Sequence, residues 1–241
     1  MEYSPSSKND WKPCTANEIL NLAPGEYEVR IAASDSNFVG EAAIIKVKHA
    51  VKFTAPKAKT GLSYTGEEQE LIERGTVEAG IGELQYSLEE NGEYKTDIPK
   101  GTDADTYEVY YKVTGSNPDY DYSASKGKVT VNIAKANQAA LSIKDVTGKK
   151  YGDTEFVLEA SGGSGTGVTI YSVPVNNGVL SINGSTAKII GAGEVTVKAV
   201  KAGDKNYNET SAELKIKIAK GAAPDIAFPT ASNLTYGQKL P

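Results

Sequence analysis

The chain has 241 residues and a formal net charge of −5, and its lysines and arginines are scattered rather than clustered. Nucleic acids and anionic membranes both bind concentrated basic surfaces, so the sequence argues against either as a partner. No apolar run approaches the roughly 18 residues that a transmembrane helix requires, so we expect no membrane insertion within this segment. The lone cysteine, Cys14, excludes an internal disulfide, unlike the paired cysteines of many small secreted domains.

Residues 1–50 have the pattern of the closing half of a β-domain. We expect a strand around Tyr3, a hairpin through Trp11 and a further strand that includes Tyr27 and Val29. No opening half precedes these elements in the sequence. The segment is therefore interpreted as the C-terminal part of a domain.

Residues 51–134 are expected to form a complete β-sandwich. The clearest alternation lies between residues 105 and 135, where one face of an extended segment carries Tyr107, Val109, Tyr111 and Val113. A second alternating run follows a polar loop and consists of Val129, Val131 and Ile133. Upstream, a strand through Tyr86 ends at Asn91-Gly92, a dipeptide that favours tight hairpins because both residues tolerate positive φ. Residues 67–74 are interpreted as strand or loop, with a short helix as the alternative.

Residues 135–220 repeat the pattern, and residues 221–241 begin it once more. Val29, Val109 and Val197 occupy equivalent positions at spacings of 80 and 88 residues. An opening signature also recurs around three tyrosines, Tyr64, Tyr151 and Tyr236, spaced 87 and 85 residues apart. Two independent landmarks with one period indicate tandem domains. The predicted fold is all-β, with small antiparallel β-sandwiches arranged end to end.

Domain boundaries are expected near Ala50 and at residues 134–136, where one closing strand runs directly into the next domain. Such short linkers restrict motion between domains and favour an extended rod. Incomplete domains at both ends suggest that the chain is cut from a longer array, because a half-sandwich exposes its core face and a bare strand edge.

At these residues the chain resembles the immunoglobulin-like repeats of large bacterial surface proteins. The second domain, with LSYTGEEQELIERG and DTYEVYYKVTGSNPDY, resembles MBG-type repeats. The third, with GVLSINGSTAKIIGAGEVTVKAVKAGDKNY, is similar to these and to the invasin-type bacterial immunoglobulin-like group. The N-terminal half-domain, with ILNLAPGEYEVRIAASDSNF, resembles fibronectin-III-like modules of the same proteins.

The resemblance implies a non-catalytic stalk or spacer of a bacterial cell-surface or secreted protein, with adhesion as an additional role. Its implied partners are the neighbouring repeats of the same chain and a host or cell-wall glycan or protein. The alternative is a carbohydrate-binding accessory module of an extracellular enzyme. The family has no catalytic residues to transfer, and no cofactor is expected. An enzyme is the third hypothesis and would need a pair of carboxylates in a concave pocket.

Tyr110 and Tyr122 are the candidate contacts for a ligand or partner. Exposed aromatic rings stack on sugar faces and anchor protein partners, and an exposed platform around these two tyrosines would support carbohydrate binding. Tyr120 is instead expected to close the core, because it aligns with Tyr207 and approximately with Phe38.

Other residues with chemical potential are expected to be structural. His49 lies at the end of a closing strand without a second histidine, and Cys14 lacks a basic neighbour that would activate it. The glycine-rich run at residues 162–167 lacks the lysine that ends a phosphate-binding loop, so we expect a hairpin or crossover loop. Two aspartate pairs, Asp103/Asp105 and Asp119/Asp121, are more typical of turns than of a calcium site, which needs six to eight oxygen ligands.

Overall fold

A computed structural model describes residues 1–14, 21–176, 178–223 and 225. The described residues form β-strands and connecting loops without a helix, which confirms the predicted all-β class. None of them forms a helix that could cross a membrane. The chain divides into two compact units, Met1–Ala136 and Asn137–Pro241. The truncated repeat expected at residues 221–241 lies almost entirely outside the described residues.

Unit 1 begins with a four-stranded antiparallel sheet in the order β2-β1-β3-β4. Its strands are β1 (Glu2–Pro5), β2 (Lys12–Pro13), β3 (Gly25–Arg30) and β4 (Ala43–Val47). The strands expected around Tyr3 and Val29 are confirmed, and these two residues pair with each other across β1 and β3. The Arg30 guanidinium lies 3.5 Å from the centre of the Trp11 ring.

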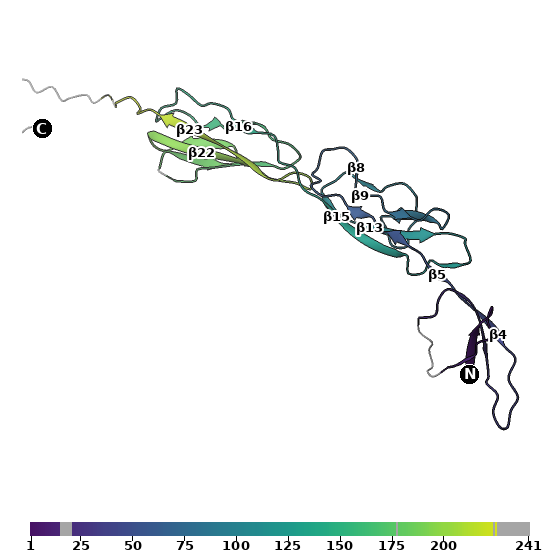
Figure 1. Cartoon of the computed structure of the whole chain (residues 1–241). Helices are drawn as coiled ribbons and strands as arrows, with labels where there is room; N and C mark the ends of the chain where they lie inside the picture. The colour runs from purple at the N-terminus through teal and green to yellow at the C-terminus, as the bar shows by residue number, and fades with distance from the viewer. Residues whose placement is uncertain (15–20, 177, 224, 226–241) are drawn as a thin grey trace, which may run out of the picture. The chain divides into compact units, whose positions relative to one another are not determined.

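The rest of unit 1 is built around a three-stranded sheet in the order β11-β13-β15. These strands are β11 (Glu83–Ser87), β13 (Asp105–Thr114) and β15 (Lys126–Ile133), and β13 and β15 lie side by side in Figure 1. Three short antiparallel pairs complete the domain: β6 (Phe53–Thr54) with β10 (Thr76–Val77), β7 (Lys57–Ala58) with β9 (Ile72–Glu73), and β8 (Gln69–Glu70) with β12 (Lys100–Gly101). Residues 67–74 therefore contain two short strands and not a helix.

The core of this domain follows the predicted alternation. Val109 and Val113 on β13 and Val131 and Ile133 on β15 are buried, together with Leu71 from the opposite side. Burial of apolar surface contributes about 25 cal/mol per Å², so the burial of these side chains stabilises the domain.

Unit 2 repeats this plan. Its three-stranded sheet has the order β19-β22-β23, formed by β19 (Thr169–Ser172), β22 (Gly193–Lys201) and β23 (Thr210–Ile218). Opposite it lie β17 (Phe156–Val157), β21 (Thr186–Ile189) and β20 (Leu180–Asn183), with a further pair of β16 (Leu141–Ile143) and β18 (Ala160–Gly162). Val195 and Val197 on β22 and Ile216 and Ile218 on β23 are buried in its core, which also includes Leu158.

The repeated opening signature closes each domain by the same backbone contact. In unit 1, Tyr64 N–H donates to the Ala134 carbonyl and Ala134 N–H donates to the Leu62 carbonyl, each at 2.9 Å. In unit 2, Lys150 and Ala219 form the equivalent parallel bridge: Tyr151 N–H donates to the Ala219 carbonyl and Ala219 N–H donates to the Lys149 carbonyl, each at 2.9 Å. The signature thus joins the opening segment to the end of the last strand in both units.

A second parallel contact connects the first sheet of unit 1 to its main domain. The short strand β5 (His49–Ala50) pairs in parallel with β14 (Tyr120–Asp121). The His49 N–H donates to the Asp119 carbonyl at 2.7 Å, and the Lys46 ammonium forms an ion pair with the Asp119 carboxylate at 2.5 Å.

The turn at Asn91-Gly92 differs from the predicted one. The chain does reverse there, since Tyr86 and Lys95 exchange backbone hydrogen bonds. Neither Asn91 nor Gly92 has positive φ. Glycine is favoured at residue 92 for another reason: a Cβ there would lie 2.9 Å from the Ser87 hydroxyl oxygen.

Candidate binding surface

Tyr110 lies on the outer face of β13, between the core residues Val109 and Tyr111. Because side chains alternate along a strand, it shares this face with Glu108 and Lys112. Its hydroxyl donates a 2.6 Å hydrogen bond to the Glu108 carboxylate, which also accepts one of 2.6 Å from Lys128. The ammonium of Lys128, directly opposite Tyr110 on β15, is 5.8 Å from the centre of the tyrosine ring.

These hydrogen bonds favour the ionised form of Glu108 and the neutral form of Tyr110. The contacts from Lys128 and Tyr110 lower the pKa of Glu108, so its carboxylate is ionised at neutral pH. The same hydrogen bond to Glu108 raises the pKa of Tyr110, so its hydroxyl remains a donor. The Tyr110 ring is thus held in one orientation by charged neighbours.

A groove lies beside Tyr110 on this outer face. Its floor comes from β13 and β15, and its wall comes from the loop after β11, with Glu90, Asn91 and Tyr94. The Tyr94 hydroxyl donates to the Glu90 carbonyl at 3.0 Å, and the Lys112 ammonium lies 4.0 Å from the centre of the Tyr94 ring. The cavity volume is about 560 Å³, within the range of small-molecule sites. We call this feature the Tyr94–Tyr110 groove; its lining residues are Glu90, Asn91, Tyr94, Tyr110, Tyr111, Lys112, Lys126, Gly127 and Lys128.

Tyr122 does not belong to this groove. Its ring packs against the core of unit 1, and its hydroxyl donates a 2.5 Å hydrogen bond to the Ile81 carbonyl. Tyr120 also packs against this core, as expected, with its ring 5.3 Å from the His49 ring. Phe38, which the repeat alignment matched approximately to Tyr120, is 97% exposed. The alignment therefore fails at that position in the half-domain.

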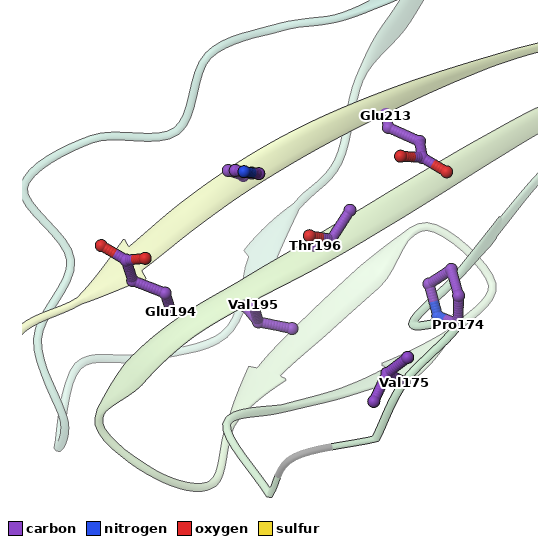
Figure 2. A pocket seen from close by; sticks show the side chains of 7 residues that line it. Pro174, Val175, Glu194, Val195, Thr196 and Glu213 are labelled. Atoms are coloured by element: carbon purple, nitrogen blue, oxygen red, sulfur yellow. The ribbon is translucent and has the colours of Figure 1, made fainter.

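A second hollow, of about 480 Å³, lies on the outer face of β22 and β23 in unit 2 (Figure 2). It contains the carboxylates of Glu194 and Glu213, the type of pair that glycoside hydrolysis would need. Glu213 is paired with Lys198, four residues along β22 from Glu194. At about 3.3 Å per residue this offset places the two backbone positions about 13 Å apart along the strands. Glycosidases hold their two carboxyl groups about 5–10 Å apart.

The remaining candidates occupy structural positions. His49 is exposed on β5, and Cys14 is a half-buried free thiol. The Asp119 carboxylate pairs with Lys46, and that of Asp121 accepts the Ser123 N–H at 2.9 Å. Over the described ranges, no group of three or more His, Cys, Asp or Glu side chains is arranged to hold a metal ion.

The glycine-rich run at residues 162–167 is a loop held by side chains of unit 2. Asp204 accepts hydrogen bonds from the Thr166 N–H at 2.8 Å and from the Asn206 and Tyr207 N–H groups at 2.9 Å. The Lys201 ammonium donates to the Gly167 carbonyl at 2.7 Å. Gly162, Gly163 and Gly165 have positive φ, a conformation that glycine adopts without strain. The glycine-rich run thus forms a backbone turn.

Tyr110, which the sequence predicts as a contact residue, lines the groove, but the sequence did not predict the residues beside it. Tyr94 lies 16 residues earlier in a loop, and Lys126 lies on another strand. Strand alternation predicts that three lysines point outward: Lys112, Lys126 and Lys128. Which of them face each other depends on the register between β13 and β15.

The chain matches no protein-family model and no curated protein. Among solved structures, it aligns with the crystal structure of mouse cadherin-23 EC22-24 at 13% sequence identity, over 81% of this chain and 74% of that chain, with a TM-score of 0.29. It also aligns with the S-layer protein rSbsC(31-844) at 12% identity, over 94% of this chain and 36% of that chain, with a TM-score of 0.29. Likenesses at this level carry no argument about function, which must rest on the architecture and surfaces of the chain itself.

Proposed function

We propose that the chain is a non-catalytic segment of tandem immunoglobulin-like repeats from a large bacterial cell-surface or secreted protein, in which it acts as a stalk or spacer. The observation that carries this proposal is the repetition of one domain plan, with the same three-stranded sheet and the same parallel closure at Ala134 and at Ala219. Each copy has a hydrophobic core of its own. Tandem repeats of self-contained domains suit a spacer because length is added without a new site.

The junction between the two units supports this role. Ala134 is hydrogen-bonded within unit 1, and the side chain of Asn137 accepts a hydrogen bond from Asn208 in unit 2 at 3.0 Å. Gln138 donates to the carbonyls of Ala202 and Asn208 at 2.9 and 2.8 Å. Only residues 135 and 136 separate these anchored positions. So short a linker restricts the angles that two domains can adopt.

Small-angle X-ray scattering of the whole chain tests the spacer role. We expect an elongated particle with a narrow distribution of maximum dimensions. A matched variant with about ten Gly and Ser residues inserted between Lys135 and Ala136 should show a broader distribution, because a flexible linker behaves as a random coil. A compact particle for the unmodified chain, or identical profiles for both proteins, would overturn the spacer proposal.

Carbohydrate recognition is the second candidate function, and the Tyr94–Tyr110 groove is the observation that favours it. The groove combines two half-buried tyrosine rings with polar side chains on one surface of unit 1. Adhesion to a glycan and the role of an accessory module of an extracellular enzyme would both use such a surface. Retention of the chain on polysaccharide columns tests this function, and loss of retention in Tyr110→Ala would assign it to the groove.

A further inference from the structure

The Tyr94–Tyr110 groove contains an arrangement of charges that is unfavourable in the free protein. Lys112 on β13 lies directly opposite Lys126 on β15, and Lys128 is the next outward residue on the same strand. Like charges opposite each other destabilise a sheet. Lys128 is compensated by its ion pair with Glu108. Within the part of the chain that the structure describes, neither Lys112 nor Lys126 forms an ion pair with a carboxylate.

The outer face of the matching sheet in unit 2 pairs opposite charges instead. On the outer face of β22 and β23, Glu194 is opposite Lys217 and Lys198 is opposite Glu213. Opposite charges at such positions stabilise a sheet. The positions of unit 2 that match Lys112 and Lys126 are Val200 and Ser211, which also face each other and carry no charge. The facing lysines are thus specific to unit 1, and two neighbouring ammonium groups beside a groove favour an anionic ligand.

The apolar part of the groove consists of aromatic rings. No aliphatic side chain lines it, and its largest non-polar surfaces are the tyrosine rings. A peptide partner is usually anchored by apolar side chains in well-packed pockets, which this groove does not offer. A sugar presents a flat C–H face to an aromatic ring and hydroxyl groups to polar neighbours such as Asn91. The surface therefore suits a carbohydrate better than a peptide.

Two contacts prepare the groove for binding before any ligand arrives. Glu108 holds the Tyr110 hydroxyl, and the backbone carbonyl of Glu90 holds that of Tyr94. The rings need no reorientation, which reduces the conformational entropy lost on binding. The Lys112 ammonium also has a fixed neighbour, since it lies 4.0 Å from the centre of the Tyr94 ring.

We propose that the Tyr94–Tyr110 groove binds an acidic oligosaccharide, with a sugar carboxylate between the ammonium groups of Lys112 and Lys126 and a pyranose ring against Tyr110. The carboxylate relieves the repulsion between the two lysines, and the tyrosine ring covers the apolar face of the sugar. The inference builds on the proposed surface role, because it names what such a repeat would adhere to. Ligand binding is measured by calorimetry and the spacer role by scattering, so either proposal can fail while the other stands.

Isothermal titration calorimetry of the whole chain against three probes tests this proposal. The probes are an oligogalacturonate, which is an acidic sugar; a cello-oligosaccharide of equal length, which is neutral; and an oligoglutamate, which is an acidic peptide. We expect the oligogalacturonate to bind most tightly. Its affinity should fall as salt is added, because exposed charges are screened.

Lys126→Gln and Lys112→Gln should each weaken oligogalacturonate binding by about fivefold, as expected for the loss of one exposed charge contact. Lys126 is exposed and faces a like charge, so its variant should unfold at the temperature of the parent or slightly above it. Lys215→Gln is the matched control, because it removes an exposed lysine from the outer face of the equivalent sheet in unit 2 and should leave binding unchanged.

Three results would overturn the proposal. The first is no binding of oligogalacturonate, and the second is equal binding of oligoglutamate, which would indicate a peptide partner. The third is binding that Lys112→Gln and Lys126→Gln leave unaltered or that Lys215→Gln weakens equally. Tyr110→Ala adds a check on the stacking contact, and the lysine variants keep the test valid if this substitution disturbs folding.

Discussion

Tyr122 donates a hydrogen bond of 2.5 Å to the backbone carbonyl oxygen of Ile81, which lies 41 residues earlier in the chain. The contact connects the loop before β15 to the loop before β11. Gly115 lies directly beneath it, and a Cβ at that residue would overlap both the Tyr122 hydroxyl and the Ile81 carbonyl. Tyr122 thus closes one end of the domain, and the ligand contact expected from its sequence position stays a prediction.

Tyr122→Phe should therefore lower the stability of unit 1. The variant keeps the packing of the ring and removes only the hydroxyl, so we expect a loss of about 0.5–1.5 kcal/mol in the free energy of unfolding. Urea denaturation measures this loss. Tyr151→Phe is the control, because Tyr151 is 54% exposed and packs against neither core cluster. Equal stabilities for the two variants would show that the Ile81 contact does not contribute.

The two units should unfold separately. Leu71 and Leu158 are almost completely buried, each in the core of its own unit. Leu→Ala in a core typically costs about 2–5 kcal/mol, so Leu71→Ala should shift only the transition of unit 1 and Leu158→Ala only that of unit 2. Differential scanning calorimetry resolves the two transitions. If either variant lowered both equally, the chain would behave as one cooperative domain.

The long strands could be predicted from sequence because their cores impose a strict alternation. Tyr107 to Val113 alternates between buried and outward positions over a ten-residue strand, and the run ending at Ile133 does the same. The two-residue strands between Phe53 and Glu73 have too few residues to show a period. Their pairing depends on contacts that form only after the chain has collapsed.

Less of the groove than of the fold could be predicted from the sequence. Outward positions such as Tyr110 and Lys112 follow from alternation, but the pairing of Lys112 with Lys126 is set by the register of two strands joined by a loop. A shift of one residue would place the lysines on opposite faces. Tyr94 is brought to the groove by a turn whose geometry differs from the one that Asn91-Gly92 predicted. Spatial proximity of this kind needs the structure.

The carboxylate of Asp204 should make the stability of unit 2 depend on acidity. Hydrogen bonds from the backbone N–H groups of Thr166, Asn206 and Tyr207 hold the pKa of Asp204 at about 2, below its ordinary value of 3.8. A pKa that is lower in the folded state gives stability that is fully present above pH 3.8 and is lost as the pH falls towards 2. Asp204→Ala should thus destabilise unit 2 at pH 7 and differ less from the parent at pH 2.

Thermal unfolding between pH 2 and pH 7 measures this effect. Asp145→Ala is a matched control, since Asp145 is an exposed aspartate of the same unit and makes no hydrogen bond to a described backbone group of the glycine-rich loop. We expect its difference from the parent to be small across the range. A constant difference between Asp204→Ala and the parent at all pH values would contradict the role assigned to the ionised carboxylate.

The ion pair between Lys46 and Asp119 should be visible as a shifted titration. The hydrogen bond from Lys46 lowers the pKa of Asp119, and the same contact raises the pKa of Lys46. Lys46→Gln should return the pKa of Asp119 towards its ordinary range, which NMR titration of the carboxyl carbon measures. Lys48→Gln is the control, because Lys48 lies two residues away and acts on Asp121 instead. An Asp119 pKa that Lys46→Gln leaves low would show that this ion pair is not the cause of the lowered pKa.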